Sequence, residues 1–107
     1  MYKKISNKEK NTRIINDSHS AENYITKDIS KNVSLAVTKL NGKLEENITK
    51  NERVFYFINA NVDFKIDEEI IHCDSGDALY LDKDTKYSAE GKYEAVTINV
   101  PAFGVKD

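Results

Sequence analysis

Apolar and polar residues alternate along most of the chain after residue 32. In the stretch VSLAVTKL, residues 33–40, Val33, Leu35 and Val37 share one face, and the residues between them share the other. A period of two is the pattern of a half-buried β-strand. On the same grounds, further strands are predicted within residues 52–58, 63–66, 70–74, 78–82, 85–91 and 93–100.

Turn signals separate these stretches. Asn41-Gly42 is a strong hairpin signal and predicts a turn after the first strand. Breaks are also expected at residues 59–61, at the acidic turn 67–69, at Lys83-Asp84 and at Gly91, and Pro101 ends the last strand. Many short strands with turns at regular spacing predict an all-β sandwich or barrel.

Residues 1–31 are more polar and less regular. One edge strand is predicted at NTRIIND, residues 11–17, followed by a loop with a helical turn at residues 22–30. We therefore expect an N-terminal arm, residues 1–31, packed on the barrel or on a partner, and a barrel formed by residues 32–107. A chain of 107 residues is the size of one domain.

Composition excludes several classes of function. The chain has 16 Lys and Arg against 18 Asp and Glu, a formal net charge of −2, which argues against a nucleic-acid partner. No apolar run approaches the roughly 20 residues that cross a bilayer, and the N-terminus lacks the apolar segment of a signal peptide. Cys73 is the single cysteine, so no intramolecular disulfide can form. A cytoplasmic protein without a membrane partner is the expectation.

The stretch SGDALYLDKDTKYSAEGKYEAVTINVPAF, residues 75–103, combines a Gly76-Asp77 turn, a strand, a charged turn and Tyr87 before a closing strand. With ERVFYFINANVDFKID, residues 52–67, it resembles the two motifs of the cupins, the double-stranded β-helix form of the jelly roll. The resemblance covers residues 42–103. It implies an all-β, cupin-type jelly-roll barrel and a homodimer.

The same resemblance assigns the metal-ligand positions of the family. Glu52 falls at the acidic ligand, whereas Glu45, Asn47 and Tyr87 fall where cupins carry histidines. The chain thus resembles the subgroup that lacks the metal-binding histidines, and no cofactor is expected. The alternative is an oxygen-rich site at these four residues, which would suit Mg²⁺ or Mn²⁺ better than iron or zinc.

Alternation along residues 52–57 then fixes the predicted faces. If Glu52 points into the barrel, Tyr56 points inward with it, and Arg53, Phe55 and Phe57 point outward. Two outward phenylalanines form an apolar patch that a second subunit or the N-terminal arm would cover, so a homodimer is predicted. By the same alternation we expect Cys73 in the core and His72 outside, while His19 lies in the polar arm.

The main functional hypothesis is a barrel that binds a small polar molecule, a sugar derivative or a small organic acid, without a metal. Glu52 and Tyr87 would be a catalytic acid–base pair for isomerase-like or epimerase-like chemistry. Further ligand-binding residues are predicted at Glu45, Asn47, Tyr56, Tyr80 and Phe103. Two alternatives stay open: a metal-dependent enzyme with the oxygen-rich site, and a non-enzymatic interaction module. The module becomes the better interpretation if Tyr87 is buried and its hydroxyl bonds only to protein.

Overall fold

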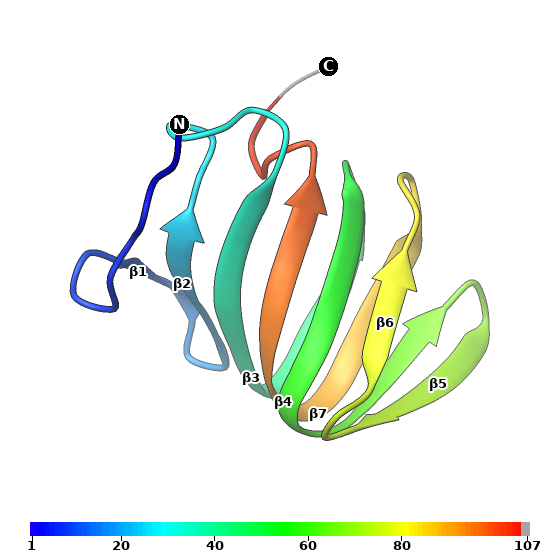
Figure 1. Ribbon diagram of the computed structural model, residues 1–107. Coiled ribbons are helices and arrows are strands. Elements are labelled where there is room, and N and C mark those ends of the chain that lie inside the picture. The colour runs from blue at the N-terminus through cyan, green and yellow to red at the C-terminus, as the bar shows by residue number, and fades with distance from the viewer. Residues whose placement is uncertain (106–107) are drawn as a thin grey trace.

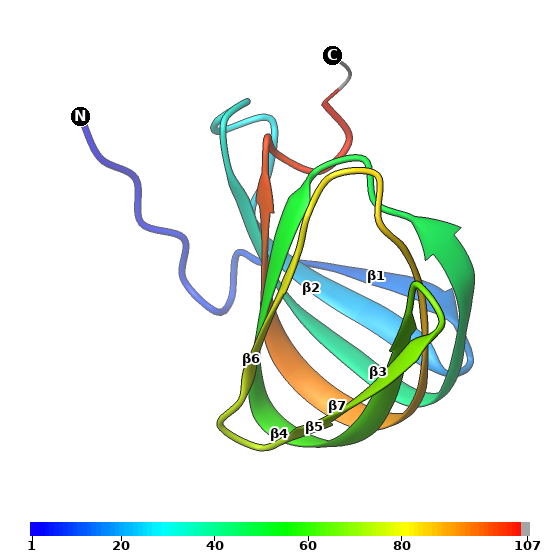
Figure 2. The same ribbon diagram turned by 90° about the vertical axis from the view of Figure 1, so that its right-hand side faces the viewer.

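A computed structural model describes residues 1–105, and all of its regular structure is β-strand. The strands are β1 Asn11–Asn16, β2 His19–Ile25, β3 Ser34–Ile48, β4 Glu52–Ile66, β5 Glu69–Asp74, β6 Ala78–Leu81 and β7 Lys86–Val100. They form one antiparallel sheet in the order β1-β2-β3-β7-β4-β5, with β6 also paired to β4 (Figure 1). The sheet curls round on itself into a barrel (Figure 2). The all-β prediction is confirmed.

Strands β3, β4 and β7 are each 15 residues long and bend as they cross the barrel. Gly42 of β3 pairs with Gly91 of β7, and their φ angles are 139° and 138°. A Cβ on Gly91 would lie 2.5 Å from the carbonyl oxygen of Asn61 on β4. The two glycines therefore let three backbones pack closely at the bend. The hairpin turn predicted at Asn41-Gly42 is wrong, because the glycine bends a continuous strand.

The break predicted at residues 59–61 is also wrong. β4 continues through this stretch, and only its register to β7 shifts between Phe57 and Asn59. The bulge receives the Gly76-Asp77 turn, whose Gly76 N–H donates to the Phe57 carbonyl at 2.8 Å. The acidic turn is confirmed between β4 and β5, with positive φ at Asp67 and Glu68. The last strand ends at Val100, before Pro101, as predicted.

The N-terminal hairpin extends the sheet. The edge strand predicted at residues 11–17 is confirmed as β1, whereas residues 22–25, predicted as loop, belong to β2. β2 pairs with β3 along its whole length. The division into an arm (1–31) and a barrel (32–107) stays a prediction, and residues 106 and 107 lie outside the described residues. Within residues 1–105, no helix is long and apolar enough to span a bilayer.

Five aromatic rings pack together inside the barrel. Phe55, Phe57, Phe64, Tyr87 and Tyr93 are at most 3% exposed. Their ring centroids lie 5.5–6.1 Å apart in seven contacting pairs, the spacing of favourable aromatic contacts. These rings, with Leu40, Val62, Cys73 and Leu81 around them, form the core.

The predicted faces of β4 are inverted in the structure. Phe55 and Phe57 point inward, while Glu52 and Tyr56 face solvent. Burying each phenylalanine stabilises the fold by about 1.5–3 kcal/mol, whereas an unpaired ionised carboxylate at the barrel centre would be costly. The hydrophobic effect therefore decides the facing of this strand. Cys73 is buried and His72 is exposed, as predicted.

Candidate functional site

Small side chains on the inner face of β2, β3 and β7 leave a cavity beside the aromatic core. Ala21, Thr38 and Ala95 are neighbours across these three strands. The next row along the barrel consists of Asn23, Ala36 and Thr97. The cavity has a volume of about 220 Å³. That is room for several water molecules.

One end of this inner cavity is bordered by chain outside the sheet. Residues 26–28 of the β2–β3 loop line it, together with Phe103 of the C-terminal segment. Figure 1 shows the loop and this segment at the same end of the barrel. Phe103 is 47% exposed, and the Phe103 N–H donates to the Ser34 hydroxyl at 2.9 Å. Phe103, predicted to bind ligand, thus borders the cavity.

Arg53 is a half-buried charged group in the cavity wall. Its Nε donates to Asn99 Oδ1 at 2.7 Å, and its Nη1 donates to the Tyr87 hydroxyl oxygen at 2.6 Å. The guanidinium carbon also lies 5.9 Å from the centroid of the Tyr87 ring. Because both acceptors are themselves buried, the guanidinium has one fixed orientation. Tyr87 lies beneath Arg53 and supports it.

A second arginine reaches the same cavity from the edge of the sheet. The Arg13 guanidinium carbon, on β1, lies 5.1 Å from the centroid of the Phe103 ring, a cation–π contact. Arg13 and Arg53 both line the inner cavity. In the part of the chain that the structure describes, neither arginine forms an ion pair with a carboxylate.

His19 also lines the cavity, at the start of β2. Its Nδ1 is buried and has no hydrogen-bond partner among residues 1–105. Burial lowers the pKa of His19, and the charges of Arg13 and Arg53 lower it further. The imidazole is therefore neutral at pH 7, and its buried Nδ1 has an unsatisfied hydrogen-bonding capacity.

Hydroxyl groups complete the wall. The Thr38 and Thr97 hydroxyl oxygens lie 2.7 Å apart in one hydrogen bond. Burial raises the pKa of the nearby Tyr93, so its phenol stays protonated. The cavity thus combines fixed cations with neutral hydrogen-bonding groups.

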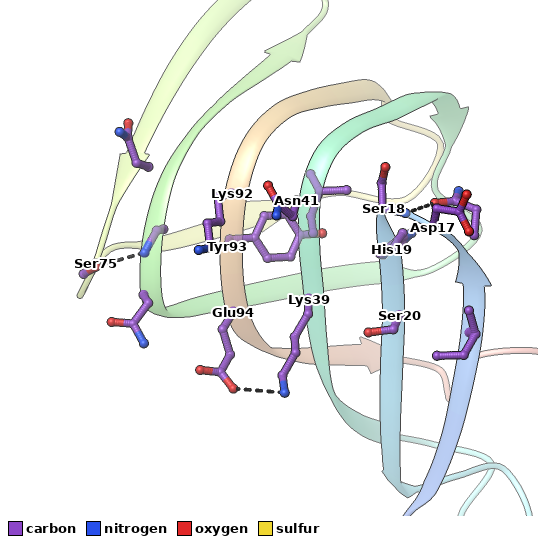
Figure 3. Close-up of a pocket in the computed structure, with 16 residues that line it drawn as sticks. Asp17, Ser18, His19, Ser20, Lys39, Asn41, Ser75, Lys92, Tyr93 and Glu94 are labelled. Carbon is purple, nitrogen blue, oxygen red and sulfur yellow. Dashed lines mark hydrogen bonds and ion pairs between the residues drawn. The ribbon is translucent and has the colours of Figure 1, made fainter.

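A second, more open pocket lies around the β1–β2 turn and the bend of the long strands (Figure 3). Its volume is about 860 Å³, and Asn16, Ser18, Asn41, Asn59, Asn61 and Ser75 are among its polar residues. Its charged side chains are partly paired, since Lys39 Nζ lies 3.7 Å from Glu94 Oε2. His19 lines both pockets, so its ring stands between the open groove and the inner cavity.

The remaining predicted site residues lie elsewhere. The Tyr80 hydroxyl donates to Glu52 Oε1 at 2.6 Å on the outside of the barrel. This hydrogen bond is the main cause that raises the pKa of Tyr80 to about 12. Tyr56 is 51% exposed on the same outer surface, and Glu45 is exposed on β3. Asn47, also exposed, is the cross-strand partner of Tyr87 and lines a further pocket with Arg53 and Phe103. Glu52 and Tyr87 are therefore not brought together, because they lie on opposite faces of the sheet.

The residues around Tyr87 do not fit the metal of the cupin fold. The guanidinium of Arg53 already donates to the Tyr87 hydroxyl, and a second cation there would be repelled. Glu52 lies outside and Tyr87 inside, so the predicted oxygen-rich set with Glu45 and Asn47 is not assembled. Among the described residues, no group of three or more His, Cys, Asp or Glu side chains is placed to hold a metal ion.

The sequence interpretation missed Arg53, Arg13 and His19 as cavity residues. A usable signal was present for Arg53, because it has the same parity as Phe55 and Phe57. Once the two phenylalanines are assigned to the core, Arg53 must point inward with them. No comparable signal marks Arg13 or His19, since their place depends on how the N-terminal hairpin joins the sheet.

No protein-family model and no curated protein matches the chain. Solved structures do resemble it. The nucleoside dehydratase Pac13 of Streptomyces has a TM-score of 0.84 at 14% identity, over 97% of this chain and 86% of that one. KdgF from Halomonas sp. has a TM-score of 0.81 at 12% identity, over 97% of both chains.

A protein described as an RmlC-like cupin, from Shewanella frigidimarina, has a TM-score of 0.81 at 11% identity, over 96% of this chain and 95% of that one. EutQ of Clostridium difficile has a TM-score of 0.73 at 15% identity over 79% of this chain, which spans 64% of the EutQ chain. The fold is that of the RmlC-like cupins, as predicted. At these identities the likeness defines the fold alone.

Proposed function

We propose that this chain binds a small polar molecule, a sugar derivative or a small organic acid, in the inner cavity without a metal. The observation that carries the proposal is Arg53, fixed by Asn99 and Tyr87 in the wall of an open 220 Å³ space. Thr38 and Thr97 offer hydroxyls to a hydroxylated ligand, and Phe103 offers a ring face. A small apolar and polar cavity with a few fixed donors is typical of a ligand site.

Chemical-shift mapping by NMR tests this proposal. We expect that members of a panel of monosaccharides, sugar acids and small hydroxy acids shift the amide signals of Ala36, Thr97 and Asn99. The substitution Ala36→Leu, which fills the cavity, should abolish these shifts without unfolding the barrel. A panel that shifts no cavity signal, or that shifts only the signals of the open groove around Asn41, contradicts the proposal.

The packing of the core favours ligand binding in which Tyr87 has no catalytic role. Tyr87 is 2% exposed, stacks on Phe64 and shares its hydroxyl with Arg53. This is the condition under which the sequence favoured a non-enzymatic module over an enzyme. Tyr87 then positions Arg53 rather than acting as a general acid.

Acid–base catalysis of the isomerase or epimerase type is a second candidate, with the proton-transfer role at His19. The observation that favours it is the neutral imidazole of His19, a residue that lines the cavity. Exchange of the hydrogen next to the carboxylate of a bound sugar acid, followed by NMR in D₂O, tests it. The exchange should vanish in His19→Gln, and its absence in the unsubstituted protein contradicts this candidate.

A homodimer is the second part of the proposal, and its basis differs from the one predicted from the sequence. Phe55 and Phe57 are buried, so they form no outer patch. Part of the outer side of the sheet is apolar nevertheless. One row across the strands consists of Leu35, Ile98, Val54 and Tyr80, and the next consists of Val37, Val96, Tyr56 and Ala78.

We call these eight residues the outer apolar face. From β3 to β6 neither row contains a charge, whereas on β2 the neighbour of Val37 is Glu22, which is paired with Lys10 and Lys39. Two copies can therefore stack face to face across a twofold axis over β3, β7, β4 and β6 without burying an unpaired ion. Light scattering on a sizing column should give twice the chain mass of 12.2 kDa. A monomer at millimolar concentration contradicts the homodimer and leaves the cavity proposal intact.

A further inference from the structure

The charges that line the inner cavity are unbalanced. Arg13, Lys27 and Arg53 contribute cations, and Asp28 is the single carboxylate. On the outside of the sheet, by contrast, Lys10 and Lys39 both contact the carboxylate of Glu22. The two cavity arginines have no such carboxylate in the described part of the chain.

Arg53 is half-buried, and both of its protein acceptors are neutral. A partly desolvated charge without a counter-ion is unfavourable and is stabilised by an anion. A guanidinium has five N–H donors, so the hydrogen bonds to Asn99 and Tyr87 leave others for a ligand. Their planar arrangement matches a carboxylate, which accepts two parallel hydrogen bonds from an arginine.

The guanidinium groups of Arg13 and Arg53 both influence the electrostatics of the inner cavity. Arg13 and Arg53 both lower the pKa of His19, which lies in the wall between the two pockets. The cation–π contact with Phe103 holds the Arg13 guanidinium over the bordering segment. An anionic group next to Arg53 would thus also feel the charge of Arg13.

We propose, building on the binding function above, that the ligand of the inner cavity is a carboxylic acid, a sugar acid or small hydroxy acid. Arg53 binds its carboxylate, Arg13 adds a second positive charge, and Thr38 and Thr97 bind its hydroxyl groups. The 220 Å³ volume admits a molecule of monosaccharide size or smaller, below the usual size of about 300–1,000 Å³ for drug-sized ligands.

Matched acid and neutral probes test the proposal. We would measure Kd by NMR titration, at constant ionic strength, for D-glucuronate against D-glucose, D-galacturonate against D-galactose, and D-glycerate against glycerol. Inorganic phosphate forms a separate arm. The acid should bind about tenfold or more tightly than its neutral partner, and Arg53→Gln should remove this preference.

Arg13→Gln provides a second variant, because Arg13 is exposed and its loss leaves the core intact. It should weaken the preference for the acid without removing binding. Lys43→Gln, at an exposed lysine that lines neither pocket, is the matched control and should leave the preference unchanged.

Each failure has a separate meaning. Equal binding of acid and neutral partners overturns the carboxylate inference and leaves the binding function standing. Tighter binding of phosphate than of any carboxylate overturns the carboxylate assignment in favour of a phosphate ester. A preference for the acid that persists in Arg53→Gln overturns the role of that arginine. No binding of any probe overturns this inference and the proposed function together.

Discussion

At the scale of single residues, Arg53 and Tyr87 depend on each other. Tyr87 has a ring that packs on Phe64 and a hydroxyl that accepts from Arg53. The ring belongs to the core and the hydroxyl belongs to the cavity, so the two contributions can be separated by substitution. The hydroxyl keeps a charged donor satisfied where water has little access.

Replacing Tyr87 by Phe should lower the free energy of unfolding by about 1.5–3 kcal/mol, because Arg53 loses the acceptor of its Nη1. Tyr87→Ala should lower it by about 3–5 kcal/mol, since the ring contact with Phe64 is lost as well. Urea unfolding measures both. Equal effects of the two substitutions would mean that the hydroxyl contributes the whole loss and that the ring contributes nothing.

The pKa values of the two histidines should be shifted in opposite directions from the ordinary value. His72 Nδ1 lies 2.7 Å from Asp63 Oδ1, and its Nε2 lies 2.9 Å from Asp74 Oδ1. These hydrogen bonds raise the pKa of His72 above 6.5, whereas burial lowers the pKa of His19. NMR titration of the ring protons should give a higher pKa for His72 than for His19.

The two shifts affect stability with opposite signs. The contribution of His72 is fully present below pH 6.5 and is lost as the pH rises through its raised pKa. The contribution of His19 is present above pH 6.5 and is lost as the pH falls through its lowered pKa. His72→Gln should therefore cost stability mainly at acidic pH. A loss that is larger at pH 9 than at pH 5 contradicts this assignment.

At the scale of the elements, period-two alternation located nearly all of the strands but not their lengths. Asn41-Gly42 and Gly91 were interpreted as turns, although each glycine bends a strand of 15 residues. A single sequence cannot separate these cases, because the need for glycine arises from a backbone on a neighbouring strand. Asp67-Glu68, by contrast, forms the turn that its polarity predicts, since nothing packs over it.

The candidate site was predictable to a smaller extent. Phe103 and Tyr87 were placed correctly in or beside the barrel interior, but Glu52 and Tyr56 were not. The error came from the assumption that Glu52 points inward. Because side chains alternate along a strand, one wrong assignment inverts the predicted facing of every residue of that strand. The hydrophobic side chains of Phe55 and Phe57 favour the core, and Arg53 has the same parity, so it points inward with them.

The bend glycines give a direct test at this scale. Gly91→Ala should abolish folding or destabilise it severely, because the new Cβ meets the Asn61 carbonyl oxygen at 2.5 Å and the φ angle is 138°. Gly76→Ala is the matched control, since its φ is also positive but no atom lies within 4 Å of the new Cβ. It should cost about 1–3 kcal/mol from backbone strain alone. Equal losses in thermal unfolding would refute the close-packing explanation.

At the scale of the whole molecule, the two sides of the sheet have different proposed roles. Its concave side surrounds the core and the inner cavity, while its convex side presents the outer apolar face. Because alternate residues of the same strands serve the two sides, an interface on one side need not disturb a ligand on the other. Association and binding should therefore be separable.

The substitution Tyr56→Lys tests this separation. It places a charge in the middle of the outer apolar face, so we expect a monomer that binds the same cavity ligand with unchanged Kd. Ile70→Lys, at a residue of β5 that is 72% exposed and outside that face, should remain dimeric. A Tyr56→Lys monomer that loses ligand binding would mean that the cavity is completed by the second subunit.

The small side chains at Ala21 and Ala36, which line the inner cavity, have a mechanical consequence. They leave space inside the folded chain, and the part of that space that water does not fill disappears on unfolding. Pressure favours whichever state occupies less volume. Compression should therefore unfold this barrel more readily than Ala36→Leu, in which that volume is filled. A bound ligand should raise the midpoint pressure of the unsubstituted protein and leave that of Ala36→Leu unchanged. Hydrostatic pressure thereby measures occupancy of the barrel without knowledge of the occupant.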